Sequence, residues 1–121
     1  MTPAETLDSA RDLLTRRAGT GVGSWPRAVA LLTRQALEKG VDAFWITNPA
    51  TAGLAACPMR TQLICLPSYL DPAIAYQVGF VWAALSGACH YHPYELAPTA
   101  SQLNGWIEIV ARLLATLSLA E

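Results

Sequence analysis

The sequence predicts an all-α fold, namely an antiparallel up-and-down bundle of four main helices and one short helix. Three observations lead to this prediction. Apolar residues recur at steps of three and four, helix-start signals precede these segments, and no run alternates apolar and polar residues as a strand would. A chain of 121 residues suits one domain, and we expect residues 1–121 to form it.

Helix-start signals divide the chain into segments. A capping residue precedes a Pro in the first turn, or a Glu or Gln three residues later, at four places: Thr2 with Pro3 and Glu5, Ser24 with Pro26, Asp71 with Pro72, and Thr99 with Gln102. The long helices should run from Thr2 to about Arg17, from Ser24 to near Asn48-Pro49, from Asp71 to about Cys89, and onward from Thr99. A short helix is expected at about Pro58–Leu66, because Pro67 cannot continue it cleanly.

For two of these helices the sequence also predicts how they pack. In the second helix, Gly40 lies within the apolar stripe, and we expect it to allow close packing. The segment 71–89 has no charge after Asp71 and is apolar on more than one side, which places it at the centre of the fold or at an interface. It superficially resembles a membrane span, but Gln77 and Ser86 interrupt it and no basic residue flanks it closely. We therefore expect a helix of a soluble bundle.

The composition is apolar for a small domain. Hydrophobic residues make up 53% and charged residues 14% of the chain, whereas about a quarter of a typical domain is charged. Such a chain has a large core or buries surface against a partner, and we expect a homodimer. The net charge of -1 argues against electrostatic binding of nucleic acid over the whole surface of the protein. A local basic patch stays open, because six cations fall in the first third: Arg11, Arg16, Arg17, Arg27, Arg34 and Lys39.

Residues with reactive or ionisable side chains are concentrated between the last two predicted helices. Residues 87–95 read Gly-Ala-Cys-His-Tyr-His-Pro-Tyr-Glu and hold both histidines, one of three cysteines, two tyrosines and a carboxylate. Loops that a rigid scaffold positions commonly carry sites. A linker between two helices also collects such residues for capping alone, so both interpretations are open.

A metal site and a cysteine nucleophile are the weaker interpretations of this stretch. Cys89, His90 and His92 have the chemistry of ligands, but paired Cys or His at zinc-site spacing are absent. A reactive thiol needs an exposed, electropositive environment, and no cation lies near Cys89 in the sequence. We therefore expect no metal ion and no cofactor.

Acid–base chemistry on RNA fits these residue types better. A ribonuclease that works without a metal needs a group to take the 2′-hydroxyl proton, a group to protonate the leaving 5′-oxygen, and a cation for the phosphorane charge. Histidine suits proton transfer because its pKa lies near neutrality. Here His90 and His92 stand beside Tyr91 and Tyr94, but a local cation is missing.

The same stretch resembles the motif of the HEPN superfamily (higher eukaryotes and prokaryotes nucleotide-binding). Many members carry R-x-x-x-x-H, and a toxin branch carries R-x-x-x-x-H-x-Y, at the end of a central helix. His92 and Tyr94 match at the expected spacing, and Gly87 stands where the family has Arg. Arg34–Glu38 and Tyr94–Thr99 are similar to the second helix and the closing element of the family. The likeness covers roughly residues 25–117.

The resemblance implies a small helical bundle that often dimerises, with a cleft at Gly87 to Tyr94. We take His92, Tyr94 and His90 as the candidate catalytic residues. In active relatives the arginine is taken to hold the scissile phosphate, so Gly87 implies that ribonuclease activity is weak or lost; Arg60, on the short helix, is a candidate to reach the cleft. The leading expectation is a toxin-type or RNA-interacting module, with RNA and a nucleotidyltransferase-type antitoxin as the implied partners.

Two other classes of function stay open. In a structural interaction protein, His90 and His92 would cap the helix that ends near Cys89. A pocket in the apolar core would instead suit a small ligand or a nucleotide. No secretory signal opens the chain, and its three cysteines are odd in number and widely spaced, which predicts a cytoplasmic location and no membrane partner.

Overall fold

The computed structural model confirms an all-α fold. It describes residues 1–20, 23–90 and 96–119, and within these ranges there are helices and no strand. The long helices are α1 (Pro3–Arg17), α2 (Trp25–Ile46), α4 (Pro72–Cys89) and α5 (Ala100–Leu119). The short α3 (Met59–Cys65) lies between two 3₁₀ helices, η1 (Ala52–Ala56) and η2 (Leu66–Ser68). Each helix that the start signals predicted is present, with bounds within a few residues of those expected.

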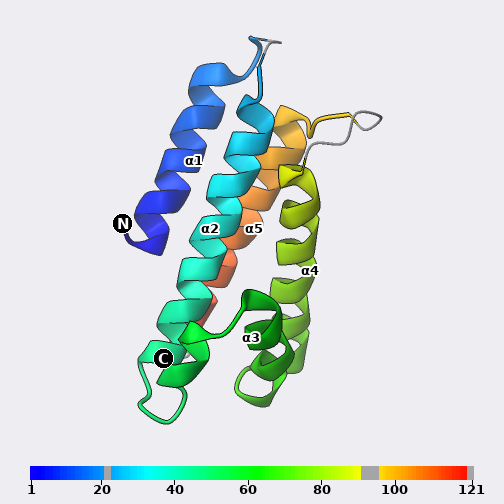
Figure 1. Cartoon of the computed structure of the whole chain (residues 1–121). Coiled ribbons are helices and arrows are strands. Elements are labelled where there is room, and N and C mark those ends of the chain that lie inside the picture. The colour runs from blue at the N-terminus through cyan, green and yellow to red at the C-terminus, as the bar shows by residue number, and fades with distance from the viewer. Residues whose placement is uncertain (21–22, 91–95, 120–121) are drawn as a thin grey trace.

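The central helix of the bundle is α2. Figure 1 shows α2 between α1 on one side and α4 on the other, with α5 behind, and α2 contacts all three. The short α3 lies beside the half of α4 that is nearest Pro72. Of the two places expected for residues 71–89, the centre of the fold is therefore excluded, and α4 lies at the edge of the bundle.

The helix α4 is apolar along its length, yet most of it lies outside the core. Only 22% of residues 72–89 are buried, and by length and composition α4 is the one helix in the described part of the chain that could cross a membrane. Its buried residues follow a single face: Ala75, Val78, Val81 and Leu85. Large apolar side chains on the other side are left uncovered, among them Phe80, which is 64% exposed.

The core forms where regularly spaced apolar residues of the long helices meet. On α5 the buried positions are Leu103, Ile107, Val110, Leu113 and Leu117. These positions follow the steps of three and four that the sequence shows, and Ile107 is fully buried whereas Trp106 is only partly buried. Gly40 is buried on α2, and a Cβ at this position would overlap the side chain of Leu114. The expectation that Gly40 allows close packing is confirmed.

Both predicted capping boxes are present. Thr2 Oγ1 accepts from the N–H of Glu5 at 3.1 Å, and the N–H of Thr2 donates to Glu5 Oε1 at 3.0 Å. Thr99 and Gln102 make the equivalent pair at 3.1 and 2.9 Å. The predicted cap at Ser24 is wrong, because its side chain makes no capping hydrogen bond. The helix still begins at the expected place, with a Pro in its first turn.

A buried glutamine fixes α3 to the end of α2. Gln62 is 2% exposed. Its Oε1 accepts from Trp45 Nε1 at 3.1 Å, and its Nε2 donates to the carbonyl oxygen of Cys57 at 2.8 Å. Both ends of the amide are therefore used, which a polar group buried in a protein requires.

We expect Gln62→Leu to lower the free energy of unfolding by about 2–4 kcal/mol, because the buried Trp45 N–H and the part-buried Cys57 carbonyl would lose their partner. Gln35→Leu, at an exposed position of α2, is the matched control and should change it by less than about 0.5 kcal/mol. Urea denaturation followed by circular dichroism measures both variants. Equal losses in the two would contradict this account of Gln62.

Candidate functional site

The structure describes part of the site that the sequence predicts. Of the candidate catalytic residues, His90 is described, whereas His92 and Tyr94 lie outside the described residues. His90 follows the last turn of α4 with its side chain exposed, and its backbone N–H donates to the carbonyl oxygen of Gly87 at 3.3 Å. The cap at His90 is therefore made by its backbone.

A hollow of about 200 Å³ lies at this end of α4. Arg27 of α2, Gly87 and His90 at the end of α4, and Gln102 and Trp106 of α5 are among its lining residues. Pockets for drug-sized ligands usually span about 300–1,000 Å³. This hollow is smaller, and a compact polar group such as a phosphate suits it better.

Arg27 brings positive charge to the hollow. Its Nε donates to the carbonyl oxygen of His90 at 3.4 Å, although the two residues are 63 positions apart in the sequence. The guanidinium therefore lies beside the stretch in which no local cation was found. Sequence reasoning did not single out Arg27, because the register of α2 against α4 cannot be read from the chain. In the sequence it was only one of six cations in the first third of the chain, at the first turn of a predicted helix.

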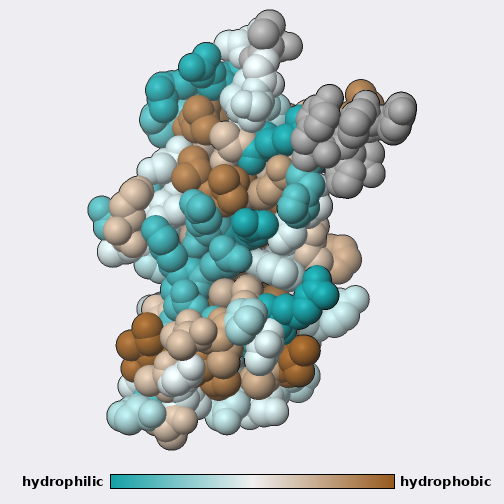
Figure 2. Space-filling model, in the orientation of Figure 1, coloured by the Kyte–Doolittle hydropathy of each residue, from teal (hydrophilic) through white to brown (hydrophobic). Residues whose placement is uncertain are grey.

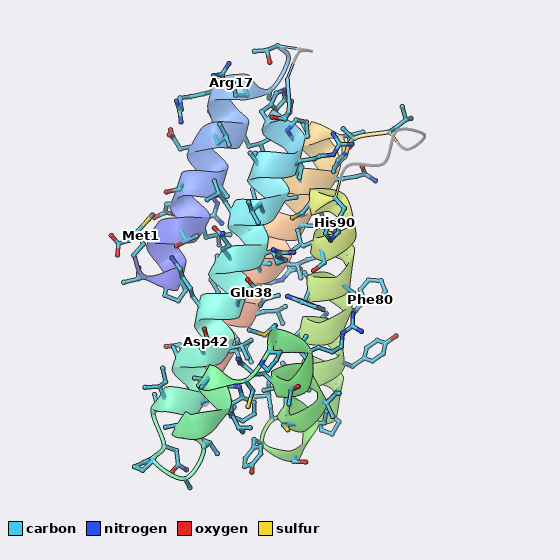
Figure 3. The ribbon with its side chains drawn as sticks, viewed as in Figure 1. Met1, Arg17, Glu38, Asp42, Phe80 and His90 are labelled. Atoms are coloured by element: carbon cyan, nitrogen blue, oxygen red, sulfur yellow. The ribbon has the colours of Figure 1, made fainter. Side chains whose placement is uncertain are left out.

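Arg60 does not line this hollow. It is an exposed residue of α3, and Figure 1 shows α3 beside the opposite half of α4. Figure 3 shows His90 at the far end of α4 from that half. The cation next to His90 is thus Arg27, and the suggestion that Arg60 reaches this end of α4 finds no support.

Most of the other cations in the first third of the chain also lie close to polar side chains. The distances are 3.4 Å from Arg11 to Glu108, 3.0 Å from Arg16 to Asp12, 3.9 Å from Arg34 to Glu38, and 2.9 Å from Lys39 to the Thr6 hydroxyl. Figure 2 shows hydrophilic residues gathered over α1 and α2 in the middle of the molecule. Because acidic residues are mixed with the basic ones, these cations do not form a patch of a single sign.

Cys89 lies near polar groups that join α2 to α4. Trp82 Nε1 donates to Glu38 Oε2 at 3.0 Å, and Arg34 Nε lies 3.9 Å from the same oxygen. Burial raises the pKa of the Cys89 thiol, although the charge of Arg34 acts in the opposite direction. A thiol with a raised pKa holds little thiolate at neutral pH, which argues against a cysteine nucleophile.

The part of the chain that the structure describes contains no group of three or more His, Cys, Asp and Glu side chains able to hold a metal ion. Cys57, Cys65 and Cys89 are free thiols. A second hollow of about 470 Å³ lies between α1, α2 and α5, with Gly40 and Leu114 in its lining. Of the candidate catalytic residues, His90 is the one that the structure describes, and it does not line this hollow. A small ligand of the kind left open by the sequence would fit there by size.

Comparison with known proteins finds no relative. The chain matches no family model, no curated protein and no solved structure. The likeness to the HEPN superfamily therefore rests on the sequence resemblance alone.

Proposed function

We propose that the protein is a HEPN-like, RNA-interacting module in which the hollow at the end of α4 receives a phosphate of the RNA. The observation that carries this proposal is the position of Arg27. Its guanidinium is held at the His90 carbonyl and lines the same hollow as Gly87. Arg27 thus supplies the positive charge that Gly87 lacks, and arginine suits phosphate because its planar fork matches the phosphate oxygens.

The chemical roles follow from the motif. Of His92 and Tyr94, one takes the proton of the 2′-hydroxyl as that oxygen attacks phosphorus, and the other gives a proton to the leaving 5′-oxygen. Arg27 stabilises the charge that develops on the phosphorane, and His90 borders the phosphate. Arg27 comes from a different helix than the motif arginine, so its geometry differs from that of active relatives. Binding is therefore the principal activity, and cleavage is weak or lost.

The proposal extends to the finer architecture and to the partners. The four long helices form an antiparallel up-and-down bundle, and the chain direction supports this by reversing between successive long helices in Figure 1. A toxin-type role with a nucleotidyltransferase-type antitoxin rests on the resemblance alone. The cytoplasmic location rests on the sequence features given above.

A second candidate function is that of a non-catalytic interaction module. The uncovered apolar side of α4 favours it, because a soluble chain rarely leaves such a helix unpartnered. The two candidates differ in one property that can be measured, which is affinity for RNA.

We expect Arg27→Gln to weaken the binding of a single-stranded RNA by about tenfold or more, because a charged hydrogen bond to phosphate is lost. Fluorescence anisotropy at low salt with EDTA measures the affinity. Arg112→Gln, at an exposed position of α5, removes the same charge and should have little effect. Arg60→Gln tests the other candidate cation in the same way. Equal losses in all three variants would show that binding is non-specific and that Arg27 has no special place.

We also expect Gly87→Arg to raise RNA cleavage by up to about 10²–10³-fold, the usual effect of one transition-state donor. Among the described residues, no atom lies within 4 Å of a Cβ built at Gly87, so the start of a side chain meets no clash there. His92→Ala in the same background should abolish the gain. Gel assays in EDTA exclude a contaminating metal nuclease. No gain from a well-folded Gly87→Arg variant would remove the case for a decayed ribonuclease, and cleavage by the unmodified protein that survives His92→Ala would place the site elsewhere.

A further inference from the structure

Two aromatic side chains lie exposed on α4, nearer its start. Tyr76 and Phe80 are 74% and 64% exposed, and their rings stack with centroids 6.4 Å apart and an interplanar angle of 23°. Figure 3 shows Phe80 pointing outward from α4, away from α2. Next to the rings is an apolar hollow of about 420 Å³, which Leu63 of α3 and Gly79 help to line. Exposed apolar surface of this kind commonly marks a binding site.

We propose that Tyr76 and Phe80 form a stacking platform for RNA bases, and that Arg60 binds a phosphate beside it. The platform is a second contact for the RNA whose phosphate occupies the hollow at Gly87, so this inference rests on the proposed function. The ligand is a single strand that lies along α4, because the bases of a duplex are already stacked on one another and offer no free face to an aromatic ring.

The first argument is the alignment of the platform with the hollow at the end of α4. Exposed positions follow one another along this helix at steps of four, three and four, namely Tyr76, Phe80, Ala83 and Gly87. Residues at these steps form one stripe on a helix. At about 1.5 Å per residue, Phe80 lies about 10 Å and Tyr76 about 17 Å from Gly87 along the helix axis. About five nucleotides spaced as in a duplex, at roughly 3.4 Å each, span the longer distance. One short strand therefore reaches both places.

The second argument is charge. Leu63 lines the hollow beside the rings, and Arg60 precedes it by three positions on α3, so the two residues share a face of that helix. Arg60 is exposed, and its side chain forms no ion pair or hydrogen bond with the residues that the structure describes. No acidic residue lies between Pro72 and Cys89, so the stripe carries no charge that repels phosphate.

The third argument comes from Gly79, which lies between the two rings in the sequence. Glycine is among the least favourable residues inside a helix, so an interior glycine generally has a packing reason. Among the described residues, no neighbouring side chain lies within 4 Å of a Cβ built at Gly79. What the missing side chain does is open the hollow beside the rings. Cavities of about 150 Å³ already hold benzene, so this hollow has room for a base.

These features together are those of proteins that bind single-stranded nucleic acid. Such proteins combine a cation that follows the backbone with aromatic rings on which successive bases stack, and the stacking tolerates any sequence because every base has a π face. RNA thus accounts for the rings and for the unpaired Arg60 with one ligand. A lipid surface fits less well, because Gln77 is exposed on the same helix and no basic cluster flanks it.

Fluorescence anisotropy with a short single-stranded RNA tests the inference. We expect Phe80→Leu to raise the dissociation constant by about tenfold, because leucine keeps the apolar bulk and removes the face on which a base stacks. Tyr76→Leu should act likewise. Tyr69→Leu is the matched control and should have little effect, since Tyr69 is also exposed but its ring packs against Trp45 of α2, outside the stripe. Circular dichroism checks that each variant is folded.

A second RNA separates stacking from an indirect effect of the substitution. An RNA of the same length with abasic positions keeps its phosphates and lacks the bases, so Phe80→Leu and the unmodified protein should bind it equally. Arg60→Gln should weaken the binding of both RNAs and make the slope of log affinity against log salt shallower by about 0.7. Phe80→Leu should leave this slope unchanged, because it removes no charge.

Unchanged affinity of both Phe80→Leu and Tyr76→Leu for the RNA with bases would overturn the inference, and the proposed function would still stand if Arg27→Gln weakens binding. Weaker binding by the two leucine variants but not by Arg27→Gln would support the platform and contradict the phosphate hollow. A protein that binds no RNA would contradict both. Loss of a dimer in Phe80→Leu without a change in RNA affinity would assign the face to a protein partner and overturn the inference.

Discussion

The close packing of α2 against its neighbours is the constraint on which the rest of the structure depends. Gly40 lacks the Cβ that would overlap Leu114, so α2 and α5 can approach. Because α2 is fixed along its length, both of its ends are positioned. The first turn places Arg27 at the His90 carbonyl, and the last turn places Trp45 against Gln62. The first turn of this central helix thereby contributes Arg27 to the lining of the hollow at the end of α4.

The features that the sequence predicted well are local ones. Capping boxes join residues three positions apart, and apolar periodicity repeats within one helix, so both can be read along the chain. Ser24 shows the limit of such signals, because a capping residue type does not ensure a capping bond. The contacts that define the candidate site are not local. Arg27 meets His90 across 63 positions and Trp82 meets Glu38 across 44, and these distances depend on the register between helices.

The helix α4 shows a related limit. Its apolar composition predicted that α4 would be buried, but not what would cover it. Within the described chain α2, and not α4, is the central helix of the bundle. The same helix departs from an ordinary surface helix in two ways, since it has no charge and carries interior glycines with open space around them. Gly87 lines the hollow that we propose for a phosphate, and Arg27 of α2 lines the same hollow.

The central claim is that Arg27 contacts an RNA phosphate. The salt dependence of RNA affinity tests this most directly, because each phosphate neutralised on a single strand contributes about 0.7 to the slope of log affinity against log salt. The account predicts that the slope for Arg27→Gln is shallower than that of the unmodified protein by about this amount. Parallel lines for the two proteins would contradict it, since they would show that Arg27 displaces no counterion from the RNA.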